Sequence, residues 1–285
     1  MQEHQPYIVD VMIAGLSFTA PDKIPSGWIT FRVHNNSAMV HFAVVEKLPP
    51  GIGVADQQKE VAPVFQQGMD LLSQGDEAAA QSKFAELPEW FGKIAFLGGP
   101  GLTSAGLTSQ TTLYLEPGTY MLECYVKTNG TFHSYNPVPG QFGMVHQFIV
   151  TETSSGSHEP QATFELTISS EEGIHAPPRI KSGKQTVAVH FSDQKEYANF
   201  VGHDVHLARL TADTDLAQLE KWMDWTQPHG LETPAPVTFM GGTNEMPAGK
   251  TGYLSVSLEP GRYAWIAEVP DARKKGMLKI FEVYN

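Results

Sequence analysis

The sequence predicts an all-β protein made of two tandem β-sandwiches with helical insertions, and three observations support this. Runs rich in β-branched and aromatic residues recur from one end of the chain to the other. The 26 glycines and 20 prolines suit many short strands joined by tight turns. A series of short motifs from the first half also returns, in the same order, in the second half.

The predicted strands alternate with turns along the whole chain. They are expected at residues 28–33, 41–45, 112–115, 120–126 and 147–150, and again at 164–168, 186–191, 253–257, 263–269 and 278–283. Two stretches have a helical pattern instead. Residues 55–87 predict two helices with a break at 73–75, after which Asp76 is the expected N-cap. Residues 215–225 predict a shorter amphipathic helix.

The repeated motifs define the expected domain organisation. The matching segments start at Ile24 and Ile180, His41 and His203, Phe96 and Phe239, Leu115 and Leu258, and Gly143 and Gly276. Residues 151–162 are rich in Ser, Thr, Glu and Pro and lack apolar periodicity, which is typical of a linker. We therefore expect one domain over residues 1–150, a linker over 151–162 and a second domain over 163–285.

Composition excludes several classes of function. The 285 residues are enough for two domains of about 140 residues each. The 31 acidic against 19 basic residues give a net charge of −12, which argues against a nucleic-acid partner. No apolar run approaches the roughly 20 residues of a membrane span. The start of the chain lacks the features of a signal peptide, which fits either a cytosolic protein or a mature exported one.

One constellation in the first half carries chemistry. The chain contains a single cysteine, which lies in the segment Gly118-Thr119-Tyr120-Met121-Leu122-Glu123-Cys124 and is followed by a loop and then Gly143-Met144-Val145. His133 is the histidine within that loop, and His41 follows the polar turn Asn35-Asn36-Ser37. This arrangement resembles the cupredoxin, or blue copper, family, and in particular an exported branch with a long loop between cysteine and methionine.

The resemblance implies a Greek-key sandwich of cupredoxin type in both halves and one copper site in the first. It implies His41, Cys124, His133 and Met144 as the copper ligands, a redox partner protein, and a periplasmic or secreted location. Two imidazoles, a thiolate and a weak thioether are indeed a donor set that suits copper electron transfer. The second half has Ala267 at the position of the cysteine, so no copper site is expected there.

Two alternatives remain open at this stage. The gaps of eight residues from Cys124 to His133, and of ten from His133 to Met144, are long for the family. The loop could therefore leave His133 exposed and the thiol unligated, and the protein would then be a metal-free scaffold that binds a protein partner or a small ligand. An enzyme is the weakest reading, because the His-x-His pairs of multicopper oxidases do not occur in the chain. The pair His203 and His206 is expected to be structural, since residues three apart on a strand face opposite sides.

Overall fold

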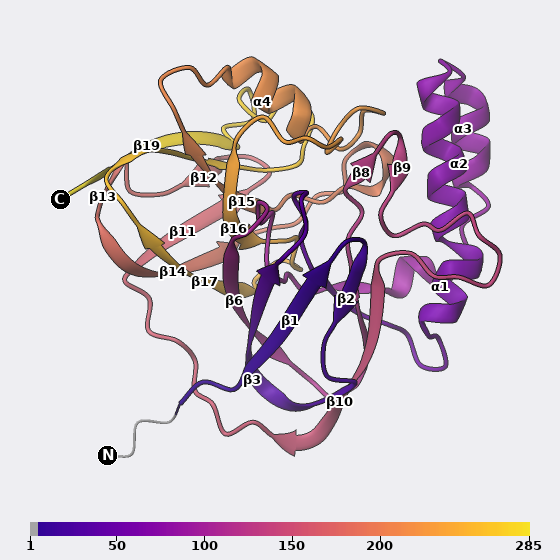
Figure 1. Cartoon of the computed structure of the whole chain (residues 1–285), viewed down its shortest axis with the longest axis horizontal. Coiled ribbons are helices and arrows are strands. Elements are labelled where there is room, and N and C mark those ends of the chain that lie inside the picture. The colour runs from indigo at the N-terminus through magenta and orange to yellow at the C-terminus, as the bar shows by residue number, and fades with distance from the viewer. Residues whose placement is uncertain (1–4) are drawn as a thin grey trace.

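The computed structural model describes residues 5–285 (Figure 1). The expectation of export rests partly on the polar start of the chain, whose first four residues lie outside the described part. None of the helices among residues 5–285 is long and apolar enough to span a membrane.

The first half is a sandwich of two β-layers. One layer contains β1 (Ile8–Ala14), β2 (Ser17–Thr19), β3 (Lys23–Asn35) and β6 (Thr108–Leu115). The other contains β10 (Val145–Ser154), β7 (Gly118–Glu123), β4 (Val44–Lys47) and β5 (Ala95–Phe96), hydrogen-bonded in that order. Strand β3 belongs to both layers, because its start pairs with β10 and the rest pairs with β1 and β6.

The second half repeats this strand order. One layer is formed by β12 (Gly173–His175), β11 (Phe164–Ser169), β14 (Gly183–Phe191) and β17 (Thr251–Leu258). The other is formed by β13 (Arg179–Lys181), β19 (Leu278–Tyr284), β18 (Gly261–Ile266), β15 (Val205–Leu210) and β16 (Thr238–Thr243). The all-β class with helical insertions is therefore confirmed.

The two halves are joined edge to edge. Strands β6 and β17 pair antiparallel, with Thr112 opposite Tyr253 and Gln110 opposite Ser255. One hydrophobic cluster also runs through both halves, from Val9 to Val283. The domain division at 150 and 163 stays a prediction, and β10 continues to Ser154, into the predicted linker.

The helical insertion of the first half lies on one side of the sandwich (Figure 1). It contains α1 (Val54–Glu60), α2 (Ala62–Ser73) and α3 (Glu77–Phe84). The predicted break after residue 73 is present, and the Asp76 side chain caps α3 by accepting from the Ala79 N–H at 2.9 Å. The sequence predicted two helices over residues 55–87, and this was wrong, because a further break at Val61 divides the first of them into α1 and α2. Pro63 has no N–H for a continuous helix and suits the first turn of a new one.

The shorter insertion of the second half contains α4 (Leu216–Met223). Asp215 is its N-cap and accepts from the Ala217 and Gln218 N–H groups at 2.9 and 3.1 Å. The strand expected at residues 41–45 begins only at Val44. His41 instead forms an isolated β-bridge with Thr103.

Candidate metal centre

The polar turn before His41 fixes the position of this residue. The Asn35 side chain is 1% exposed and donates to the carbonyls of Met39 and Thr103, at 2.7 and 2.8 Å. The His41 N–H donates to the Thr103 carbonyl at 3.2 Å, and the Thr103 N–H donates back at 2.7 Å. The backbone on both sides of His41 is therefore held by hydrogen bonds.

The long loop after Cys124 folds back as a hairpin. Strands β8 (Lys127–Thr128) and β9 (Thr131–Phe132) pair with each other across Asn129 and Gly130. Both turn residues have positive φ, 52° and 75°, as the tight Asn-Gly hairpin turn requires. The His133 N–H then donates to the Val126 carbonyl at 2.8 Å, which returns His133 to the cysteine.

The end of the loop closes on the same point. The Cys124 N–H donates to the Met144 carbonyl at 3.2 Å, and the Met144 N–H donates to the His133 carbonyl at 2.6 Å. Gly143 allows this approach, because a Cβ there would lie 2.1 Å from the carbonyl carbon of Ser134. The backbone of Met144 thus bridges Cys124 and His133, and its side chain is fully buried.

Three possible metal-donor atoms lie close together, two at the ends of this hairpin and one on His41. The Cys124 Sγ lies 3.5 Å from Nδ1 of His41 and 3.8 Å from Nδ1 of His133, and the two Nδ1 atoms lie 3.2 Å apart. A point equidistant from atoms with these separations lies about 2.0 Å from each of them, which is close to metal–nitrogen and metal–sulfur bond lengths. The donor set therefore fits a metal ion without rearrangement of the backbone.

Burial sets the protonation of these groups. Burial lowers the pKa of His41 to about 4, and burial together with the neighbouring His41 lowers the pKa of His133 to about 3. Both rings are therefore neutral at pH 7 and can offer a lone pair. Burial raises the pKa of the Cys124 thiol to about 12, so a thiolate here requires a cation beside it.

The helical insertion holds the ligand loop in place. Gln58 accepts from the Gly143 N–H at 2.7 Å and donates to the Ser134 carbonyl at 2.8 Å. Gln66 accepts from the Phe132 N–H and donates to the Gly130 carbonyl, both at 2.9 Å. Helices α1 and α2 therefore cover the loop that carries His133.

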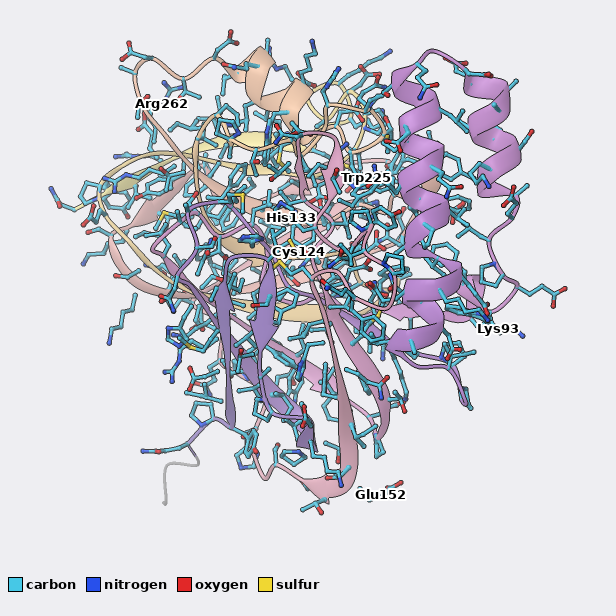
Figure 2. All side chains as sticks on the ribbon, turned by 45° about the vertical axis from the view of Figure 1, so that its right-hand side comes forward. Lys93, Cys124, His133, Glu152, Trp225 and Arg262 are labelled. Carbon is cyan, nitrogen blue, oxygen red and sulfur yellow. The ribbon has the colours of Figure 1, made fainter. Side chains whose placement is uncertain are left out.

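The second half covers the site from another side. The Lys127 N–H donates to the Leu231 carbonyl at 3.0 Å, and the Thr233 N–H donates to the Lys127 carbonyl at 2.9 Å. Trp225 stacks on Phe132 with ring centroids 6.0 Å apart. Figure 2 shows Cys124 and His133 in the middle of the molecule, with Trp225 on the side of the helices. As a result His41, Cys124, His133 and Met144 are each at most 2% exposed.

The predicted residues thus reach one place, and their role as ligands remains a proposal. In the second half, His203 occupies the repeat position of His41 and lies 3.0 Å from the Asp193 carbonyl through Nε2. It belongs to no candidate metal cluster within residues 5–285.

A second buried cluster was missed on the sequence. Nε2 of His206 lies 2.6 Å from Oδ2 of Asp204 and 3.0 Å from Oε1 of Glu268. The Leu102 N–H donates to Nδ1 of the same ring at 3.0 Å, so the ring proton sits on Nε2. A metal ion at Nε2 would require a ring that is deprotonated at both nitrogens. We therefore interpret this cluster as a set of hydrogen bonds from His206 to two carboxyl groups and not as a metal site. The cluster could have been suspected from Glu268, a carboxylate that directly follows Ala267, the residue at the repeat position of Cys124.

Comparisons with known proteins give structural neighbours only. No protein-family model matches the chain, and no curated protein matches it either. Auracyanin A, a "blue" copper protein from Chloroflexus aurantiacus, is 21% identical and covers 52% of this chain and 100% of its own, with a TM-score of 0.30. Auracyanin from Roseiflexus castenholzii is 16% identical, covering 45% and 100%, with a TM-score of 0.30. A blue copper oxidase from Nitrosomonas europaea is 13% identical, covering 98% and 86%, with a TM-score of 0.26.

The class of protein follows from the chain's own topology and site. Two mixed β-sandwiches carry one buried His-Cys-His cluster in the first of them. The resemblance to the cupredoxins stated on the sequence is thereby confirmed, as a cupredoxin-like fold with a candidate copper site.

Proposed function

We propose that the chain binds one copper ion through His41, Cys124 and His133, with Met144 as a weak fourth ligand, and that it transfers electrons. The observation that carries this is the buried triangle of two imidazole nitrogens and one sulfur, with sides of 3.2, 3.5 and 3.8 Å. Bound copper would supply a one-electron couple in which a thiolate and two imidazoles suit both oxidation states.

Each residue has a role that follows from its surroundings. Cys124 supplies the soft anionic donor, and its burial excludes water from the sulfur. The two histidines are neutral and present Nδ1, while Thr128 lies 2.9 Å from Nε2 of His133 and orients that ring. The backbone hydrogen bonds of Met144 to Cys124 and His133 hold this residue next to two of the ligands, and its side chain is fully buried.

Burial favours electron transfer over catalysis on a substrate. All four residues are at most 2% exposed, so a substrate has no open approach to the site. Electrons, unlike substrates, cross packed protein. The net charge of −12 suggests a redox partner with a basic face. We also propose that the protein works in the periplasm or outside the cell, on the resemblance alone.

Titration with Cu(II) tests the proposal. Addition of one equivalent to the metal-free protein should give an intense visible absorption, because thiolate-to-copper charge transfer requires the Cys124 sulfur. Absence of that band, with the fold intact by circular dichroism, would leave the metal-free scaffold as the better description.

A further inference from the structure

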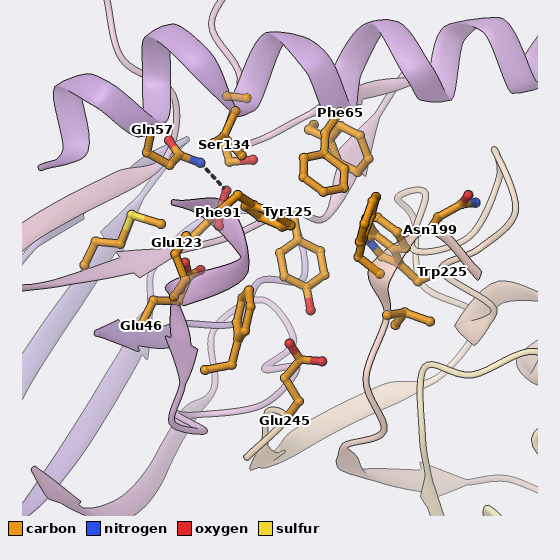
Figure 3. A pocket seen from close by; sticks show the side chains of 18 residues that line it. Glu46, Gln57, Phe65, Phe91, Glu123, Tyr125, Ser134, Asn199, Trp225 and Glu245 are labelled. Atoms are coloured by element: carbon orange, nitrogen blue, oxygen red, sulfur yellow. Dashed lines mark hydrogen bonds between the residues drawn. The ribbon is translucent and has the colours of Figure 1, made fainter. Parts of the chain in front are cut away.

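A cavity lies between the helical insertion, the β4–β7 face and the second half, next to the candidate metal centre. It has a volume of about 70 Å³, room for roughly five to seven water-sized positions. Aromatic rings form much of its wall, among them Phe65, Phe91, Tyr125 and Trp225. Figure 3 shows Glu46 and Glu123 to one side of Tyr125, Phe65 and Trp225 to the other, and Glu245 below the Tyr125 hydroxyl.

The three carboxyl groups come from separate segments. Glu46 lies on β4, Glu123 ends β7, and Glu245 follows β16. None of the described residues that line the cavity is Lys, Arg or His. The cavity therefore collects acidic groups without a basic side chain to compensate them.

One polar atom in the cavity wall lacks a partner within residues 5–285. Nε1 of Trp225 makes no hydrogen bond, and the residue is 6% exposed. The carboxyl groups of Glu46 and Glu123, in contrast, hydrogen-bond each other. Leaving a buried donor unsatisfied costs stability, so the N–H of Trp225 points to a ligand that carries a hydrogen-bond acceptor.

Backbone strain is concentrated at the same wall. Asn199 and Phe200 have φ values of 58° and 71°, in the left-handed region that non-glycine residues rarely adopt. This conformation brings the Phe200 ring to centroid distances of 5.9 Å from Phe65 and 5.7 Å from Phe91. Strain of this kind is common at ligand clamps.

A larger outer pocket adjoins the cavity. It has a volume of about 360 Å³ and shares Phe91, Phe96, Phe200 and Glu245 with the cavity. These four residues therefore form the wall between the two spaces.

We propose that this cavity binds a small organic ammonium ion of about the size of choline. The aromatic rings would attract the cation by cation–π interaction, and the carboxyl groups of Glu46 and Glu245 would supply the counter-charge. A hydroxyl group on the ligand would accept the free N–H of Trp225. The site is separate from the copper ligands, so it stands or falls independently of the proposed function.

The protonation of the cavity carboxyl groups agrees with this assignment. Burial raises the pKa of Glu46 well above its usual range, and burial with the charge of Asp204 raises the pKa of Glu245 to about 8. The cavity walls therefore disfavour ionised carboxyl groups, and a bound cation would relieve that penalty.

Calorimetric titration with choline chloride and with 3,3-dimethylbutan-1-ol tests the proposal. The alcohol has the shape of choline without its charge. Choline should bind the wild-type protein about tenfold or more tightly than the alcohol, in metal-free and copper-loaded protein alike. No binding of choline, or equal binding of the alcohol, would overturn the proposal.

Variants locate the site. Glu46→Gln and Glu245→Gln should each weaken choline binding about tenfold, because each removes a carboxyl group that can ionise beside the bound cation and keeps the side-chain shape. Glu152→Gln, an exposed position on β10, should leave it unchanged. Two variants are used so that misfolding of one, detected by near-ultraviolet circular dichroism, leaves the other as the test. Unchanged choline binding in a folded variant of either kind would place the ligand elsewhere.

Discussion

The Thr128 hydroxyl lies 2.9 Å from Nε2 of His133, and 2.8 Å from the hydroxyl of Thr233 in the second half. This chain of two hydroxyl groups connects the second sandwich to a candidate copper ligand. It fixes the plane of the imidazole ring and leaves Nδ1 directed at Cys124 and His41. Outer partners of this kind commonly set the affinity of a metal site.

Thr128→Val should weaken Cu(II) binding about 10- to 100-fold while the fold is kept, because valine has the same shape without the hydroxyl. The affinity is measured by competition with a chelator. Thr131→Val, in the same hairpin, is the matched control and should bind copper as the wild type does. Equal affinities for all three proteins would show that Thr128 does not position the ring.

Cys124→Ser should abolish the visible band on Cu(II) addition, because serine supplies no thiolate. The side chain is fully buried, so we expect a cost of about 1–3 kcal/mol in the free energy of unfolding and a retained sandwich. His203→Ala, at the repeat position of His41 in the second half, should leave the band unchanged. A band that persists in Cys124→Ser would exclude this cysteine as a ligand.

Met144→Leu should keep the visible band and move the reduction potential, because the axial ligand tunes the potential without supplying the charge-transfer band. Met277→Leu is the control, since Met277 is the fully buried repeat equivalent in the half that lacks the cysteine. Both potentials are measured by redox titration of the band. If the two variants have the same potential, Met144 is not a ligand.

Glu245→Gln should change how stability depends on pH. The folded-state pKa of Glu245 is raised to about 8, above the unfolded value, by burial and the charge of Asp204. The native state therefore holds a proton that the unfolded state releases, and this costs stability as pH rises from about 4.5 to 8. Chemical denaturation should show that the variant gains about 4 kcal/mol relative to wild type between pH 4 and pH 8.

Glutamine at this position can still accept the Gly202 N–H, which donates to Glu245 at 2.8 Å. The matched control is again Glu152→Gln, whose stability should follow the wild type across the range. A stability difference between Glu245→Gln and wild type that does not vary with pH would contradict the raised pKa.

Cleavage within residues 155–162 should leave the two halves associated. This segment contains no strand and is largely exposed, so a protease can reach it. The halves share the β6–β17 pairing and one hydrophobic cluster, so the nicked protein should elute from gel filtration at the position of the intact chain. Elution as two smaller species would show that each sandwich stands alone.

Much of the fold could be predicted from local patterns. Each strand predicted from β-branched and aromatic runs is present in the two sandwiches, although its ends are shifted. These strands were predictable because the alternation of side chains is a property of the strand itself. Asp76 was identified as a helix N-cap because capping depends only on the residues that follow, whereas Asp215, placed inside the predicted helix 215–225, is the N-cap of α4. The extra helix break was also visible in principle, because Pro63 acts through its own ring.

The candidate site was predictable only as a set of residues. His41, Cys124, His133 and Met144 were recognised by motif and spacing, whereas their convergence depends on pairings that the motif does not encode. His41 and His133 are 92 residues apart and meet because the bridge to Thr103 and the β8–β9 hairpin bring them together. The length of the loop did not determine whether His133 would reach Cys124. The β8–β9 hairpin, Gln58 and Gln66 fold the loop back, and these contacts exist only in the tertiary structure.

By itself the sequence determined the all-β class, the repeat of motifs, the Asp76 cap and the set of candidate copper ligands, because each is recognisable from short motifs. Only the tertiary structure decided that the second half seals the site, that β6 pairs with β17, and that Glu46, Glu123 and Glu245 line one cavity. These three depend on how the sandwiches pack against each other. Packing is set by the fit of surfaces from distant segments, which no local pattern records.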